Sequence, residues 1–170
     1  IYMESRYPST AIPTRKSEIA SITSVANGSV FVNDTTNVDR IFDSRLSYTK
    51  GSHLLYMLRW ILGDSVFFKG LRSYLTDSLV SYGFARTSDL QRNLEKVSGI
   101  DLNYFFNDWF YGQGYPSYNV QWSQIGDNYA KIKMNQTTSD PSVDFFALPV
   151  ALQFKNATQQ KTVVLNNTFN

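Results

Sequence analysis

Few side chains in this sequence are able to do chemistry. Cysteine is absent, and His53 is the one histidine among the 170 residues. A zinc site in a protein normally takes three or four ligands from histidine, cysteine and carboxylate side chains, so this composition predicts no metal site within the chain. It also excludes disulfide bonds and thiolate catalysis. Any metal would have to be held by residues outside this sequence.

The remaining polar candidates favour structural roles. His53 lies at the polar edge of an apolar helix, with no partner ligand near it in sequence. Asp64 and Asp89 stand where helix caps are expected. No two carboxylates share one helical face in the way that general acid and base catalysis would need.

The most informative segment is residues 46–51, Leu-Ser-Tyr-Thr-Lys-Gly, which an amphipathic helix follows at once. By residue type alone, Tyr48 would be a half-buried core residue with its hydroxyl satisfied. Lys50 would be a solvated charge in a first helical turn, and Gly51 would allow close packing against a neighbouring element.

Taken together, Tyr48, Lys50 and Gly51 form a Tyr-x-Lys-Gly motif that resembles the one in the gluzincin zinc aminopeptidases, the family that includes aminopeptidase N and leukotriene hydrolase. The resemblance is good from about Asp43 to Val120, weaker before that range and only architectural after it. Residues 29–46 are most similar to bacterial members. The further residues that follow the family's order and spacing are Gly63, Asp64, Phe67 or Phe68, Gly70, Leu71, Tyr74, Thr87, Asp89, Leu90, Leu94, Glu95, Ser98, Gly99, Asp101, Leu102, Phe105, Phe106, Trp109, Gly114, Tyr115 and Pro116.

The resemblance implies a role for Tyr48. In the family, the tyrosine hydroxyl donates to the oxyanion of the tetrahedral intermediate, and a neutral phenol beside a zinc ion can bind that charge more strongly than the ground-state carbonyl. Lys50 is a second candidate, for supporting the substrate pocket. The resemblance also implies a peptide substrate and a zinc cofactor for the intact protein.

Three family motifs are absent from this sequence: His-Glu-x-x-His, the later zinc-binding glutamate, and the Gly-x-Met-x-Asn motif that recognises the substrate amino terminus. The resemblance places them upstream of Ile1, where the sequence opens without an initiator methionine or a signal peptide. We therefore expect the C-terminal part of a catalytic unit, which binds no catalytic zinc and hydrolyses nothing by itself.

Two other interpretations stay open. The first is a family relative that has lost catalysis and serves as a binding scaffold, which a degenerate His-Glu-x-x-His motif would reveal. The second is an unrelated helical module with a carbohydrate-binding or adhesive β-domain, which exposed, coplanar aromatic side chains on the strands would reveal.

Helices must position Tyr48. Residues 16–26 can form one short helix. From Tyr48 to Gly63 apolar residues recur at helical spacing, and further helices are expected from Asp64 to Ser78, from Thr87 or Ser88 to Ser98, and from Leu102 to Gly112. Short loops between them would make a compact antiparallel bundle.

Strands follow the helices. After Pro116 the apolar period falls from 3.6 to 2, in residues 118–122, 130–134, 148–154 and 162–165, with a turn at Gly126-Asp127-Asn128. Tyr118, Val120 and Trp122 alternate like core residues. The predicted fold class is α+β, with about four main helices followed by a partial antiparallel β-sandwich module.

This pattern predicts three parts: an irregular lead-in with a short helix (residues 1–46), the helical part of an aminopeptidase catalytic domain (residues 47–114), and a truncated antiparallel β-module (residues 115–170). The end of the sequence also reads as a strand.

Composition narrows the partners and the compartment. Sixteen basic and fourteen acidic residues give a net charge of +2 without charge runs, so nucleic acid is a poor partner. No stretch approaches the roughly 18 to 20 apolar residues of a membrane helix. The low charged fraction of 18% and the aromatic fraction of 15% lean toward a bacterial periplasmic or secreted protein over a cytoplasmic one. The oligomeric state stays open.

Overall fold

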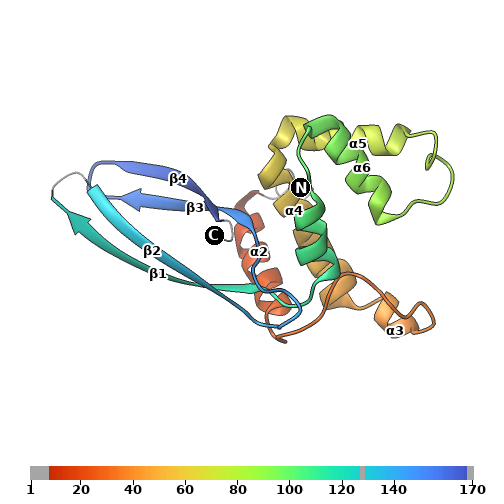
Figure 1. Ribbon diagram of the computed structural model, residues 1–170, viewed down its shortest axis with the longest axis horizontal. Helices are drawn as coiled ribbons and strands as arrows, with labels where there is room; N and C mark the ends of the chain where they lie inside the picture. The colour runs from red at the N-terminus through yellow and green to blue at the C-terminus, as the bar shows by residue number, and fades with distance from the viewer. Residues whose placement is uncertain (1–7, 127–128, 168–170) are drawn as a thin grey trace.

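The computed structural model describes residues 8–126 and 129–167, and it confirms the α+β class. Figure 1 shows the helices gathered at one end and two β-hairpins extending from them. The elements in chain order are α2 (Pro8–Ile22), α3 (Val38–Ile41), the π-helical turn η1 (Ser44–Lys50), α4 (Gly51–Leu62), α5 (Asp64–Thr76), α6 (Thr87–Ser98), α7 (Asn103–Phe105), the π-helical turn η2 (Phe106–Tyr111), β1 (Pro116–Ile125), β2 (Tyr129–Thr138), β3 (Leu148–Lys155) and β4 (Gln160–Asn167). No helix in the described ranges is long and apolar enough to cross a membrane.

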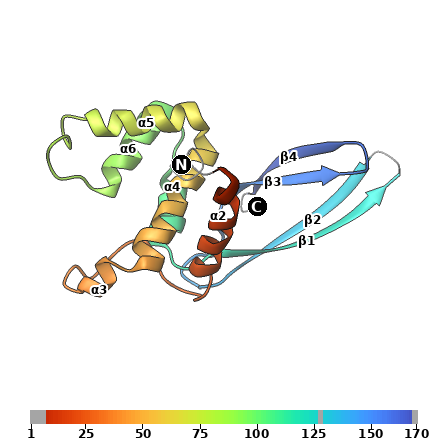
Figure 2. The same cartoon turned by 180° about the vertical axis from the view of Figure 1, so that it is seen from behind.

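The first helix differs from its prediction. It spans Pro8–Ile22 instead of residues 16–26, and it contains Pro13. Proline normally marks a break because it lacks an N–H and clashes with the preceding turn, yet here Pro13 lies inside the helix. The helix also lacks a clear apolar stripe, since Ile12 and Ile19 are exposed while Ala11 is buried. Figure 2 shows α2 between the other helices and the hairpins.

The predicted helices after Tyr48 are present. Helix α4 ends at Gly63, and α6 ends at Gly99, as expected. Helix α5 ends at Thr76, two residues before the predicted Ser78, and the connection to α6 is longer than the short loop expected. Within that connection, Tyr82 and Phe84 are fully exposed.

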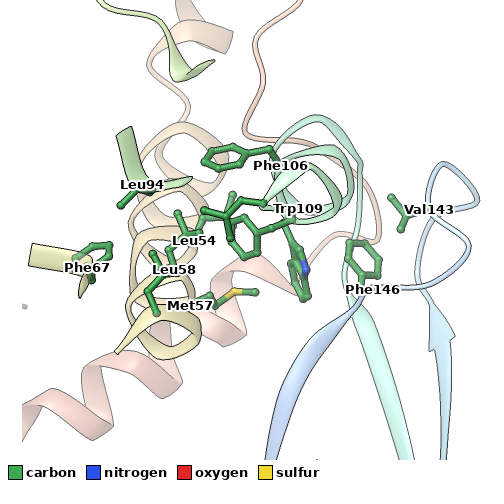
Figure 3. Close-up of a cluster of buried hydrophobic side chains, with 12 residues drawn as sticks. Leu54, Met57, Leu58, Phe67, Leu94, Phe106, Trp109, Val143 and Phe146 are labelled. Carbon is green, nitrogen blue, oxygen red and sulfur yellow. The ribbon is translucent and has the colours of Figure 1, made fainter. Parts of the chain in front are cut away.

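The core joins the helices to the segment between β2 and β3. Twelve buried apolar side chains form it: Leu54, Met57, Leu58, Leu62, Phe67, Leu94, Leu102, Phe105, Phe106, Trp109, Val143 and Phe146. Figure 3 shows Trp109 of η2 facing Phe146, and the two ring centroids are 4.6 Å apart. The indole N–H of Trp109 donates to the carbonyl of Ala147 at 3.3 Å. Phe105, Phe106 and Trp109 are therefore core residues, as their helical spacing indicates.

The strands form two separate antiparallel pairs, β1 with β2 and β3 with β4. The register pairs Val120 with Met134 and Trp122 with Ile132, so each hairpin has one predominantly apolar face, as the alternation predicts. Asp127 and Asn128, which the sequence assigns to the turn, lie outside the described residues.

The expected burial of the β1 residues is only partly correct. Tyr118 is half-buried, but Val120 is 46% exposed and Trp122 is 71% exposed. The reason is that Val120 and Trp122 line an open space of about 1030 Å³ between the two hairpins, which polar and apolar side chains both border. Tyr129, at the end of this hairpin, is also exposed and lines the same space as Trp122.

Candidate active-site segment

The π-helical turn η1 carries Tyr48 and continues directly into α4. Asp43 caps the turn, because its carboxylate accepts the N–H of Leu46 at 2.6 Å and its carbonyl accepts the N–H of Ser47 at 2.9 Å. The helix thus begins at Ser44, four residues before the predicted start. Such π-helical turns are rare and often lie at functional sites.

The side chain of Tyr48 is 57% exposed, so it is not the half-buried core residue that its type alone suggests. Among residues 8–126 and 129–167, its hydroxyl has no hydrogen-bond partner. A phenol is a neutral donor, and here a capped backbone presents it with the O–H unengaged. This arrangement suits a donor that acts on a group from outside the described structure.

Lys50, two residues further on, is buried. Its side chain is 3% exposed, and its Nζ donates to the carbonyls of Gly28 at 2.7 Å and Gly114 at 3.0 Å. Burial and the nearby charge of Arg45 lower the pKa of Lys50 to about 8, against the opposing effect of Asp140. The expectation of a solvated charge is therefore wrong.

The sequence contains a signal for this burial. Lys50, Leu54 and Leu58 lie four residues apart and so share one helical face, and both leucines are buried. A lysine in line with two core positions is expected to be covered, and the general preference of lysine for solvent outweighed that pattern in the prediction.

His53 faces a cleft of about 450 Å³ between α2 and α4. The other residues lining the cleft are Ala11, Ile12, Arg15, Lys16, Ile19 and Tyr56. Within the described part of the chain, the buried Nδ1 of His53 has no hydrogen-bond partner. Burial lowers the pKa of His53, as does Arg15, while Glu18 raises it. Burial and Arg15 therefore favour the neutral form of the imidazole.

The described residues do not supply a donor set that fits a zinc ion. In the ranges that the structure describes, no three histidine, cysteine, aspartate or glutamate side chains gather where a metal could bind. His53 would be the only imidazole ligand, and the nearby Glu18 pairs with Arg15.

The two aspartates predicted as caps differ. Asp89 accepts the N–H of Arg86 at 2.9 Å and so caps α6. Asp64 does not cap α5, because both of its oxygens bind the guanidinium of Arg59, from Nε and Nη2, each at 2.7 Å.

A polar cluster around Asp77 escaped the sequence analysis. Its carboxylate accepts from Asn93 Nδ2 at 2.9 Å and from Arg92 Nη2 at 2.8 Å, and these bonds hold the pKa of Asp77 well below its usual range. Asn93 is 2% exposed and also accepts from Ser73 at 2.7 Å. A buried asparagine in an amphipathic helix resembles an ordinary polar position until its partners on α5 are known.

Comparisons with known proteins place the Tyr48 segment in a family. A model of the peptidase family M1 domain matches residues 6–109, a range that includes Tyr48 and Lys50. The match begins earlier in the chain than the resemblance that was strong only from Asp43.

Curated relatives come from bacteria, plants and fungi. Aminopeptidase N of Lactobacillus helveticus is 32% identical over 105 residues, which are 62% of this chain and 12% of that protein. Aminopeptidase M1-D of Oryza sativa subsp. japonica is 32% identical over 142 residues, 82% of this chain and 16% of that protein. The alanine/arginine aminopeptidase of Saccharomyces cerevisiae is 34% identical over 142 residues, 79% of this chain and 16% of that protein. The chain thus spans 12% to 16% of the length of these relatives.

Proposed function

Because this chain belongs to peptidase family M1, we propose that it is part of a zinc metallo-aminopeptidase that removes amino-terminal residues from peptides. In this proposal Tyr48 supplies the hydroxyl that stabilises the oxyanion. The observation that carries the proposal is the exposed Tyr48 phenol, without a partner among the described residues, on a capped π-helical turn inside the range that matches the family.

The chemistry asked of Tyr48 is hydrogen-bond donation to a developing negative charge. When water attacks the carbonyl carbon of the peptide bond, the carbonyl oxygen becomes an oxyanion, and a donor already in position stabilises that state more than the neutral substrate. Removing one such donor typically costs about 100-fold to 1,000-fold in kcat. In this role Tyr48 donates a hydrogen bond and does not act as a base.

The other groups of this chain have supporting parts. Asp43 fixes the start of η1 through the N–H of Leu46, and the helical core holds α4 behind the turn. The zinc ion of such an enzyme, which supplies the activation of water, would be held by residues other than those described. On this proposal the 170-residue chain alone hydrolyses nothing.

The test compares the full-length protein with its Tyr48→Phe variant, using amino-acid arylamides as substrates and measuring zinc content on both. We expect kcat to fall about 100-fold to 1,000-fold with zinc content unchanged, because only the hydroxyl is removed. Tyr82→Phe is the matched control, since Tyr82 is also exposed but lies in the loop between α5 and α6.

Two outcomes would contradict the proposal in different ways. A Tyr48→Phe variant with full kcat would remove the oxyanion role but leave the aminopeptidase activity standing. A zinc-free, inert full-length protein would instead favour a catalytically silent relative that acts as a binding scaffold.

A further inference from the structure

A buried ammonium group connects segments that are far apart in the sequence. Lys50 Nζ reaches the carbonyl of Gly28, 22 residues earlier, and that of Gly114, 64 residues later. Hydrogen bonds from a charged donor are stronger than neutral ones, and a buried charge is stable only when such partners satisfy it. The two carbonyls therefore satisfy the buried ammonium group of Lys50.

The two segments that Lys50 binds also bind each other. We define the junction segment as residues 112–115, between η2 and β1. Within it, the N–H of Gly114 donates to the carbonyl of Gly28 at 3.3 Å, and the hydroxyl of Tyr115 donates to the carbonyl of Thr23 at 2.9 Å. The N–H of Gly28 donates to Gln113 Oε1 at 3.2 Å. Lys50 therefore adds its two hydrogen bonds to the contacts that already join Gly28 to the junction segment.

Ser139, directly after β2, ties the hairpins to the same place. Its hydroxyl donates to the carbonyl of Ala26 at 2.6 Å and accepts the N–H of Tyr115 at 2.9 Å. A Cβ atom added to Gly114, whose φ is +82°, would lie 2.5 Å from this hydroxyl oxygen. The junction segment thus has no room for a larger residue at that position.

The π-helical turn η1, which carries Tyr48, is held near both of its ends. Arg45, near its start, donates to the carbonyls of Ile22 at 3.3 Å and Asn27 at 3.1 Å. Lys50, at its end, is bound as described above. Tyr48 lies between these two cations, so the position of its backbone depends on where the lead-in and the junction segment hold them.

We infer that Lys50 is a positioning residue for Tyr48, which fixes η1 against the junction segment so that the phenol stays where the oxyanion forms. This inference rests on the proposed function. It also changes the role first considered for Lys50, because an ammonium that is 3% exposed and bound to two backbone carbonyls does not reach a substrate.

The experiment is a double-mutant cycle in the full-length enzyme, with Tyr48→Phe, Lys50→Met and the combination of the two. We expect Lys50→Met to lower kcat about 10-fold to 100-fold, the size of effect that a displaced catalytic group produces, with KM within about twofold and zinc content unchanged. The double variant should be no slower than Tyr48→Phe, because residues that act through one group are not additive. Lys69→Met, on the exposed side of α5, is the control and should keep full activity.

The outcomes separate the inference from the proposed function. If Tyr48→Phe loses activity while Lys50→Met keeps it, or if the two losses multiply, the positioning role is wrong and the proposed function stands. If the unmodified enzyme hydrolyses no arylamide, the proposed function fails and the inference falls with it.

A second variant covers the case in which Lys50→Met does not fold. Ser139→Ala removes the contacts from the hairpins to Ala26 and Tyr115 without touching η1. It should lower kcat at least threefold in the enzyme with Tyr48 and leave the Tyr48→Phe enzyme unchanged. Equal loss in both backgrounds would overturn the coupling between the junction segment and Tyr48.

Discussion

At the scale of single residues, Tyr48 and Lys50 show how two neighbours in one motif take opposite environments. Tyr48 is 57% exposed and Lys50 is 3% exposed. The tyrosine, an amphipathic side chain, tolerates either environment, whereas a buried ammonium needs bound carbonyls to offset its lost hydration. The burial of Lys50 is therefore the more costly arrangement, and its dependence on pH can be measured.

We predict that the stability of the chain conferred by Lys50 rises with pH. Burial lowers the folded-state pKa of Lys50 to about 8 from the ordinary 10.5. Between these values the unfolded chain binds more protons than the folded chain, so this contribution is present above pH 10.5 and is lost as pH falls through about 8. From pH 7 to 9.5, the free energy of unfolding of the unmodified chain should gain roughly 2 kcal/mol on that of Lys50→Met.

Urea denaturation of both chains at the two pH values checks this prediction. Arg45 and Asp140 are the charged groups that act on Lys50. Comparing the unmodified chain with Lys50→Met cancels the contributions of the other ionisable groups. A gap that stays constant or narrows with rising pH would contradict it.

At this scale the sequence predicts which residues the candidate site contains, but not their surroundings. The motif predicts a role for Tyr48, while the exposure of its side chain depends on the path of the chain around η1. The partners of Lys50 come from Gly28 and Gly114, and no local pattern links those glycines to a lysine. Every residue has a backbone carbonyl, so the residue types do not show which distant carbonyls will accept from Lys50.

At the scale of elements, α5 approaches α6 so closely that Gly70 must be a small residue. Gly51 is under no such requirement. A Cβ atom added to Gly70 would lie 2.7 Å from Leu94 Cδ2, and Leu94 is fully buried. A Cβ atom added to Gly51 would lie 3.6 Å from Val30 Cγ1, an ordinary contact. The close packing expected at Gly51 is therefore found at Gly70 instead.

Alanine substitutions at the two glycines should have opposite effects. Gly70→Ala should lower the free energy of unfolding by about 1 to 2 kcal/mol, because the cost of overpacking exceeds the gain in helix propensity. Gly51→Ala should leave it unchanged or raise it by up to about 1 kcal/mol. Chemical denaturation of the two variants measures this difference, and a Gly70→Ala chain as stable as Gly51→Ala would show that Leu94 moves aside freely.

Helices with a strong apolar period were predictable, and helices without one were not. The positions of α4 and α6 follow from apolar spacing and from glycines at their ends. Helix α2 contains Pro13 and exposes Ile12 and Ile19, so its sequence lacks the stripe on which such predictions depend. What holds it is tertiary contact with η1.

At the scale of the whole molecule, one hydrophobic core joins the helices to the hairpins. Phe146, from the segment between β2 and β3, is fully buried against Trp109. Its backbone is also held, because its N–H and carbonyl bind the side-chain amide of Gln136 at 2.7 Å and 3.0 Å. The helices and the base of the hairpins should therefore unfold together.

Phe146→Ala tests this coupling. It should lower the free energy of unfolding by about 3 to 5 kcal/mol, the usual cost of deleting a buried phenylalanine side chain. Helical circular dichroism and tryptophan fluorescence should show the same loss in a denaturant titration. Phe84→Ala is the control, because Phe84 is fully exposed and its removal should change stability by less than about 0.5 kcal/mol. A Phe146→Ala chain whose helices keep their stability would mean that the two parts fold independently.

The two-stranded sheets have a practical consequence for anyone handling the isolated chain. Among the described residues, each of the four strands has a partner on one side only, so the other side offers a row of unpaired N–H and C=O groups. Such edges are templates for strand addition by another molecule. Apolar side chains that line the space between the hairpins, such as Trp122 and Leu152, offer a further surface for association. We therefore expect aggregation through these edges to limit the usable concentration of the isolated chain, and charged or proline residues placed on the outer edges to raise its solubility.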